Sequence, residues 1–153
     1  KLGAWSMELG AWSLGHGAGS MGHGAGRLEL VGHGVMSEFR FEDFKIWQDA
    51  CDVGDTLCEI ADTLGEQHLY GFADQLRRAA LSISNNIAEG SGSVSNKEFA
   101  NFLNYARRSV FECASMVIFF ERKQHITIQE KEELIPQLSE LSRKIISFKR
   151  SLK

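Results

Sequence analysis

The sequence predicts an all-α protein, an up-down-up-down antiparallel four-helix bundle that follows a Gly-rich N-terminal tail. Two observations predict this architecture. Apolar residues recur at helical spacings of three and four in four successive segments of residues 36–153, and no segment alternates convincingly with period two. The segments are joined by connections of about five or six residues, and connections that short place successive helices antiparallel.

Residues 1–35 differ in composition from the rest of the chain. They hold ten of the 15 glycines, and from Gly3 they read GAWSMEL, GAWSLGH, GAGSMGH, GAGRLEL, VGHGVMS. Glycine costs about 1 kcal/mol per helical site relative to alanine, so this decaying seven-residue repeat does not favour a helix. Its apolar content does not offset the entropy of ordering. The chain is therefore divided into a low-complexity tail over 1–35, expected to be disordered or non-native, and a bundle over 36–153.

Two further interpretations of the tail stay open. His16, His23 and His33 could form a metal-binding tract, as His-rich segments do. Alternatively, residues 1–35 are upstream repeat DNA that is read in frame, and Met36 is the natural start of the protein.

The first helix is expected from about Phe41 to Leu64, where two neighbouring apolar stripes make one broad face. Gly65 follows as a natural helix stop. Cys51 and Cys58 lie seven residues apart in this segment, which is about 10 Å along a helix. That separation excludes a disulfide between them, and both are expected in the core.

The second helix is expected from about Tyr70 to Ala88, with a Gly-Ser-Gly turn at 90–92 after it. The third begins at Ser95, which precedes Glu98 by three residues, the spacing of a capping box. Its apolar residues repeat with period 3.5, which is typical of helices that pack at shallow angles. They are Phe99, Leu103, Ala106, Val110, Cys113, Val117 and Phe120.

The fourth helix begins at Thr127, with Glu130 at the same capping distance. Its apolar stripe repeats in the same way, at Leu134, Leu138, Leu141, Ile145, Phe148 and Leu152. Pro136 falls inside this pattern and removes one backbone hydrogen bond. We expect it to kink the helix or to make the stretch before it a separate turn.

The composition excludes several classes of protein. No stretch approaches the roughly 20 apolar residues of a membrane-spanning helix, and the N-terminal stretch lacks the apolar region of a secretion signal. The three cysteines, an odd number without paired spacing, argue against a disulfide scaffold and for a reducing cytoplasm. A di-iron bundle needs two Glu-x-x-His units, which the sequence lacks, so no catalytic residue, metal or other cofactor is predicted.

Two segments resemble a known family. They are FEDFKIWQDA (41–50) and YGFADQLRRAALSISNNIAEGSGSVSNKEFANFLNYARRSVFE (70–112), and LRRAALSISNNIAEG (76–90) is the most specific part. Over about residues 39–152 the chain resembles the four-helix-bundle proteins of 23S rRNA intervening sequences. That family is related to the accessory variability proteins of diversity-generating retroelements. Ser84 stands where members usually carry proline, which we expect to relax a kink in the second helix.

The resemblance implies a non-enzymatic protein that forms a homo-oligomeric ring, with a pentamer favoured. Retroelement members resemble adaptors that bind a reverse transcriptase and RNA. The implied function is therefore an adaptor that contacts RNA or other nucleic acid. The alternative is a protein-interaction module, for example one that docks a reverse transcriptase, without nucleic-acid binding. No membrane or small-molecule partner is expected. Aromatic residues expected at the surface, namely Phe39, Phe41, Tyr70 and Phe119, separately favour an interface between copies.

Basic residues are the candidates for nucleic-acid contact, because clustered guanidinium groups bind phosphates bidentately. Two arginine pairs flank the apolar stripes of the second and third helices, where antiparallel packing could bring them together. The C-terminal run RKIISFKRSLK adds more cations, which also suit the negative end of a helix dipole. The seven candidates are Arg77, Arg78, Arg107, Arg108, Lys144, Lys149 and Arg150. Pairing with carboxylates such as Asp74 or Glu112 is the alternative role of the arginines.

Polar residues also gather in the second helix, at Ser82, Ser84, Asn85, Asn86 and Glu89. Asn86 lies in the apolar stripe itself. A buried polar side chain needs a partner and thereby fixes the register of two helices. We predict a structural role for this cluster rather than an active site. Glu89 is expected either to accept a hydrogen bond from Arg78 or to cap the following turn.

Overall fold

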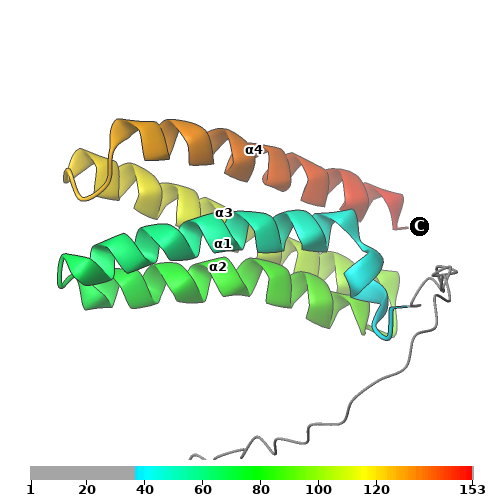
Figure 1. Cartoon of the computed structure of the whole chain (residues 1–153). Helices are drawn as coiled ribbons and strands as arrows, with labels where there is room; N and C mark the ends of the chain where they lie inside the picture. The colour runs from blue at the N-terminus through cyan, green and yellow to red at the C-terminus, as the bar shows by residue number, and fades with distance from the viewer. Residues whose placement is uncertain (1–36, 153) are drawn as a thin grey trace, which may run out of the picture. The chain divides into compact units, whose positions relative to one another are not determined.

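The computed structural model describes residues 37–152. In that range a 3₁₀ turn, η1 (Arg40–Asp43), precedes the helices α1 (Lys45–Glu66), α2 (Tyr70–Ser91), α3 (Asn96–Arg122) and α4 (Ile128–Ser151), and there is no strand. Helix α2 packs against α1 and α3, and α4 packs against α3 and less extensively against α1 (Figure 1). The predicted all-α four-helix bundle is confirmed. The predicted tail over 1–35, with its histidines, and the proposed start at Met36 lie outside the described residues.

The core consists of the apolar stripes that helical spacing predicts. All seven stripe residues of α3 are buried, and so are Leu134, Leu138, Leu141 and Ile145 of α4. Phe148 of α4 is half-buried, with its ring centroid 5.1 Å from that of Phe44 and 5.7 Å from that of Phe99. These three rings close the core where α1 and α3 begin and α4 ends.

Both predicted N-terminal caps are present. Thr127 and Glu130 form a full capping box: the Thr127 hydroxyl accepts from the Glu130 N–H at 3.2 Å, and the Glu130 carboxylate accepts from the Thr127 N–H at 2.6 Å. At α3, the Ser95 hydroxyl accepts from the Glu98 N–H at 3.2 Å. Helix α4 continues through Pro136, so the expectation of a separate turn before it is wrong.

The helices end later than the glycines predicted. Gly65 is helical, and α1 ends where His68 adopts a left-handed conformation, with φ 61°. There the Leu69 N–H returns to the Leu64 carbonyl at 2.9 Å, which satisfies a carbonyl that the helix end would otherwise leave free. Gly90 is likewise helical, because α2 continues to Ser91. Local composition alone therefore misplaced both helix ends.

The three cysteines differ in burial. Cys113 is buried, whereas Cys51 and Cys58 of α1 are only half-buried, so the expectation that Cys51 and Cys58 belong to the core is wrong. Among the helices described, none combines the length and the apolar character that a membrane crossing requires.

Candidate nucleic-acid interface

The arginine pair on α2 is occupied by carboxylates. Arg77 forms an ion pair with Asp62 of α1, and Arg78 forms one with Asp74, one turn earlier on α2, at 2.8 Å. Pairing with Asp74 is the alternative role considered for these arginines. Each guanidinium already has an anionic partner within the chain, which competes with any phosphate.

The arginine pair on α3 lies in a different groove. Arg107 turns toward α4, where its Nε donates to the Ser142 hydroxyl at 3.2 Å, and its guanidinium carbon lies 4.8 Å from the centroid of the Phe111 ring. Arg108 is exposed. Because Arg77 faces α1 and Arg107 faces α4, packing does not bring the two arginine pairs into one cluster.

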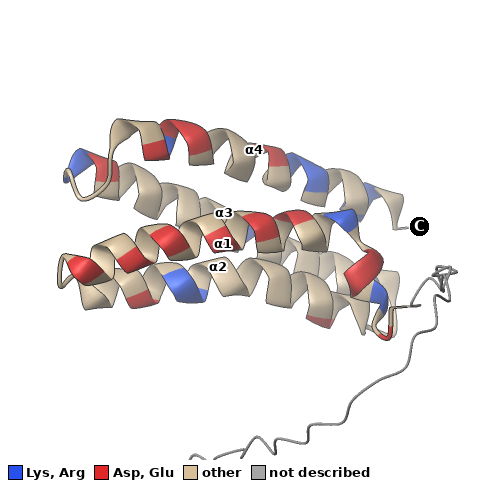
Figure 2. Ribbon diagram, in the orientation of Figure 1, with Lys and Arg blue, Asp and Glu red and all other residues tan. Residues whose placement is uncertain are grey.

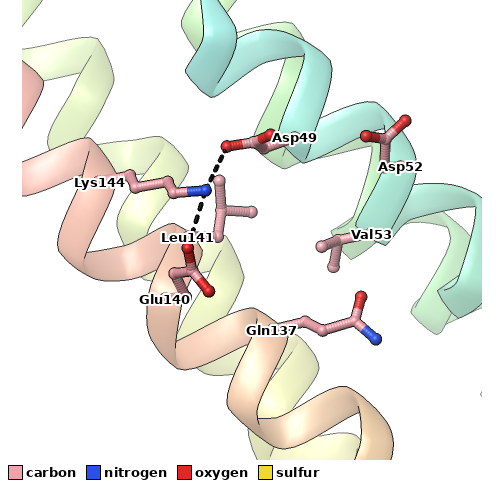
Figure 3. Close-up of a pocket in the computed structure, with 7 residues that line it drawn as sticks. All are labelled: Asp49, Asp52, Val53, Gln137, Glu140, Leu141 and Lys144. Carbon is pink, nitrogen blue, oxygen red and sulfur yellow. Dashed lines mark hydrogen bonds and ion pairs between the residues drawn. The ribbon is translucent and has the colours of Figure 1, made fainter.

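Lys144 lies in a groove between α1 and α4 in which carboxylates predominate (Figure 3). Its Nζ is 2.8 Å from Asp49 and 2.9 Å from Glu140, and Asp49 is also 2.8 Å from Lys45. Burial raises the pKa of the Asp49 carboxyl, but the hydrogen bonds from Lys144 and Lys45 outweigh it, so this pKa lies below its ordinary value. The bonds to Asp49 and Glu140 raise the pKa of Lys144. Lys144 thus joins α4 to α1.

The last two candidates lie on the other side of α4. The Lys149 ammonium donates to the Asn104 side chain at 2.7 Å and, with Arg107 and Arg150, lines a hollow between α3 and α4. Arg107 and Arg108 line the adjoining hollow beside Phe111. Across residues 37–152, the ion pairs include none of Arg107, Arg108, Lys149 and Arg150. Four of the seven candidates therefore share one surface and have no carboxylate partner there.

The hollows on α3 and α4 differ in charge from the surface of α1, while Glu112, Glu133 and Glu140 are exposed elsewhere on α3 and α4. In the described part of the chain, no Asp or Glu lines the four hollows on α3 and α4. Basic residues line them instead, at Arg107, Arg108, Arg122, Lys123, Arg143, Lys149 and Arg150. Helix α1 has the opposite character (Figure 2), with an exposed acidic ridge at Asp52, Asp55, Glu59, Asp62 and Glu66. The net charge of −3 conceals this separation.

Sequence reasoning missed three members of this basic surface. Lys144 is among the candidates from the sequence and its neighbour Arg143 is not, and the two residues lie on different faces of α4. The spacing of Arg143 and Arg150, seven residues apart, places them on one helical face and could have identified it. Arg122 and Lys123 lie at the end of α3, and their sequence position gives no signal that they share a surface with Arg107.

The polar residues of α2 separate into two groups. The Asn86 amide donates to the Ser82 carbonyl at 2.6 Å and to its hydroxyl at 3.0 Å, and the Ser82 hydroxyl lies 2.9 Å from that of Ser109 on α3. This chain of hydrogen bonds joins α2 to α3. Asn85 and Glu89 are exposed and lie outside it, and Arg78 pairs with Asp74 instead of Glu89. Ser84 is buried, and its hydroxyl donates to the Leu81 carbonyl.

Within residues 37–152, no group of three or more His, Cys, Asp or Glu side chains is arranged to hold a metal ion. The arrangement instead offers two chemically distinct surfaces, an acidic one on α1 and a basic one on α3 and α4.

Comparisons with known proteins find relatives for most of the bundle. Residues 42–147 match the family described as 23S rRNA-intervening sequence protein. A similar solved structure is that of a protein with unknown function from the S23 ribosomal protein family of Bacteroides thetaiotaomicron VPI-5482. It aligns with a TM-score of 0.66 and 22% sequence identity, over 69% of this chain and 99% of that chain. At that identity the likeness shows the fold. None of the curated proteins compared matches the sequence.

Proposed function

Because the chain belongs to the 23S rRNA-intervening sequence protein family, we propose that it is a non-enzymatic adaptor that works as a homo-oligomeric ring. In this proposal it contacts RNA, or another nucleic acid, through the basic surface of α3 and α4. The family match supports the bundle and its class, and the contact surface is inferred from the charges of this chain.

The observation that carries the proposal is the difference between paired and unpaired cations. Arg77, Arg78 and Lys144 each hold a carboxylate of the chain. The remaining candidates gather on α3 and α4 with Arg143, where no carboxylate lines the hollows of the described surface. Each phosphate that such cations neutralise releases counterions, and this release provides much of the affinity for nucleic acid.

An aromatic side chain on the same surface supports binding of single-stranded or looped RNA. Phe111 is 56% exposed and lies beside the Arg107 guanidinium. Unstacked bases pack on such rings, and arginine planes stack with them. The acidic ridge of α1 repels phosphate, so RNA is directed to α3 and α4.

The proposal is tested by titrating a fluorescein-labelled RNA stem-loop with the full chain at several salt concentrations. We expect the logarithm of the association constant to fall linearly with the logarithm of the salt concentration, and Arg108→Gln or Arg150→Gln to reduce that slope by about 1. Arg78→Gln is the matched control, because Arg78 is exposed but paired with Asp74. Absence of binding at low salt, or an equal loss in the control, would contradict the proposal.

Exposed aromatic side chains support the proposed oligomer. Phe39 is 58% exposed, Tyr70 65% and Phe119 43%, whereas Phe41 is half-buried against Trp47. Phe72 extends the surface around Phe119, with ring centroids 5.9 Å apart. The contact between Phe72 and Phe119 makes a contiguous apolar surface, which favours an interface. Light scattering should report a multiple of 17.1 kDa, five-fold for the proposed pentamer, and a monomer mass rejects the ring. Docking of a reverse transcriptase stays a prediction.

A further inference from the structure

The groove between α3 and α4 has two chemically different halves. In one half, the Lys149 ammonium donates a hydrogen bond to the Asn104 side chain at 2.7 Å. Near the connection between the two helices, Lys131 forms an ion pair with Glu121 at 3.1 Å. The first half is the basic region proposed to contact RNA. Toward the connection, the lining becomes apolar, with Val110 and Leu138 forming a buried floor.

The walls of the apolar half are exposed. Phe111 is 56% exposed and Ile118 44%, and Ile135 of α4 is half-buried opposite them. Arg107 and Arg143 also line this groove, and Arg122 and Lys123 line the hollow that continues from Ile118. The result is an apolar channel with cations at both ends. Glu132, one turn before Ile135, does not line it.

We propose that this channel docks an amphipathic helix of a partner protein, one whose apolar stripe is flanked by Asp and Glu. A helix that lies in a groove places side chains at i, i+3, i+4 and i+7 against the floor. Its flanking carboxylates would meet Arg107 and Arg143 at one end, and Arg122 and Lys123 at the other. Residues 107 and 122 are about 22 Å apart along α3 at the rise of an α-helix, so the docked segment has about 15 residues.

Charge and shape argue for a separate partner over a second copy of this chain. The chain's own acidic ridge lies on α1, and the exposed large apolar side chains of the described residues include none from α1. That ridge could pair with the cations but could not fill the channel. It would also repel an acidic helix from the other side of the bundle and so direct the helix to α3 and α4.

The inference goes beyond the proposed RNA contact and does not depend on it. Arg108, Lys149 and Arg150 do not line the apolar half. A helix docked there covers Arg107, Phe111 and Arg143, which belong to the proposed RNA surface, and leaves the other three cations accessible to nucleic acid.

The test uses the full chain and a fluorescein-labelled 15-residue peptide with leucine at i, i+3, i+4 and i+7 and glutamate at the flanking positions. We expect the peptide to bind, and its counterpart with lysine in place of glutamate to bind about tenfold more weakly or worse. Ile118→Asp and Arg143→Glu should each weaken binding of the acidic peptide by about tenfold or more. Leu81→Asp is the matched control, because Leu81 is 57% exposed on α2. This variant should bind the acidic peptide with the affinity of the parent.

The RNA stem-loop, titrated against the same variants, separates this inference from the proposed function. Ile118→Asp should weaken binding of the acidic peptide and leave the affinity for RNA unchanged. Arg150→Gln should weaken binding of RNA and leave the affinity for the peptide unchanged. Failure of the acidic peptide to bind, or equal binding by Ile118→Asp and Leu81→Asp, would overturn the docking site. A drop in solution mass on Ile118→Asp would show that a second copy fills the channel, which also overturns it.

Discussion

Gly90 of α2 lies against the ring of Phe99 in α3. A Cβ atom added to Gly90 would lie 2.5 Å from Cδ2 of Phe99 and 2.7 Å from Cβ of Phe102. The Phe99 ring has no room to move aside, because it is 2% exposed and packs between the rings of Phe44 and Phe148. The glycine therefore sets how closely α2 and α3 approach.

Replacing this glycine should destabilise the bundle. We expect Gly90→Ala to lower the free energy of unfolding by about 1–3 kcal/mol through overpacking, although alanine favours a helix by about 1 kcal/mol. Gly54→Ala is the control, since a Cβ there meets nothing within 4 Å, and it should raise stability. Urea unfolding measures both, and a Gly90→Ala variant as stable as the parent would contradict the packing argument.

The contact between Gly90 and Phe99 also shows which parts of the structure can be predicted from the sequence. Apolar spacing predicted the helices because burial repeats with the period of the helix itself. It misplaced the end of α2 because the role of Gly90 depends on Phe99, a residue of the next helix. The same limit applies to the cations. Residue type identified Arg77 and Arg107 as candidates, but only the packed bundle assigns Arg77 to Asp62 and Arg107 to Ser142.

The hydrogen-bond chain from Asn86 through Ser82 to Ser109 should behave as one unit. Asn86→Ala and Ser109→Ala are each expected to cost about 0.5–1.5 kcal/mol. The double variant should cost less than their sum, by about 0.5 kcal/mol or more, because both changes act through Ser82. Asn85→Ala, an exposed neighbour, should stay within about 0.5 kcal/mol of the parent. Strict additivity in urea unfolding would show that the two ends are independent.

The left-handed residue at the end of α3 offers a stabilising substitution. Gln124 has φ 61°, a conformation that costs a residue with a side chain about 1–2 kcal/mol relative to glycine. Gln124→Gly should therefore raise the melting temperature, even after the added freedom of the unfolded chain, and Gln124→Val should lower it. Lys123→Gly is the control, because φ at Lys123 is −91°. His68 shares the conformation, but its ring also bonds the Tyr70 hydroxyl at 2.9 Å.

The carboxylate that joins α1 to α4 makes stability depend on pH. The hydrogen bonds from Lys144 and Lys45 hold the pKa of Asp49 below its ordinary value. A lowered pKa stabilises the fold above the unfolded value of about 3.9, and this contribution disappears as the pH falls through the folded value.

Replacing Asp49 with asparagine removes the negative charge but keeps the shape of the side chain. We expect Asp49→Asn to cost about 1 kcal/mol near pH 6, where the Asp49 side chain, 14% exposed, is ionised and bridges two lysines. The difference from the parent should shrink toward zero as the pH falls through the lowered pKa of Asp49 in the folded protein. Asp52→Asn, in the same groove but outside the ion pairs of the described residues, is the control. Urea unfolding between pH 2.5 and 6 measures the difference, and a gap that widens in acid would show that Asp49 does not stabilise the α1–α4 contact as an anion.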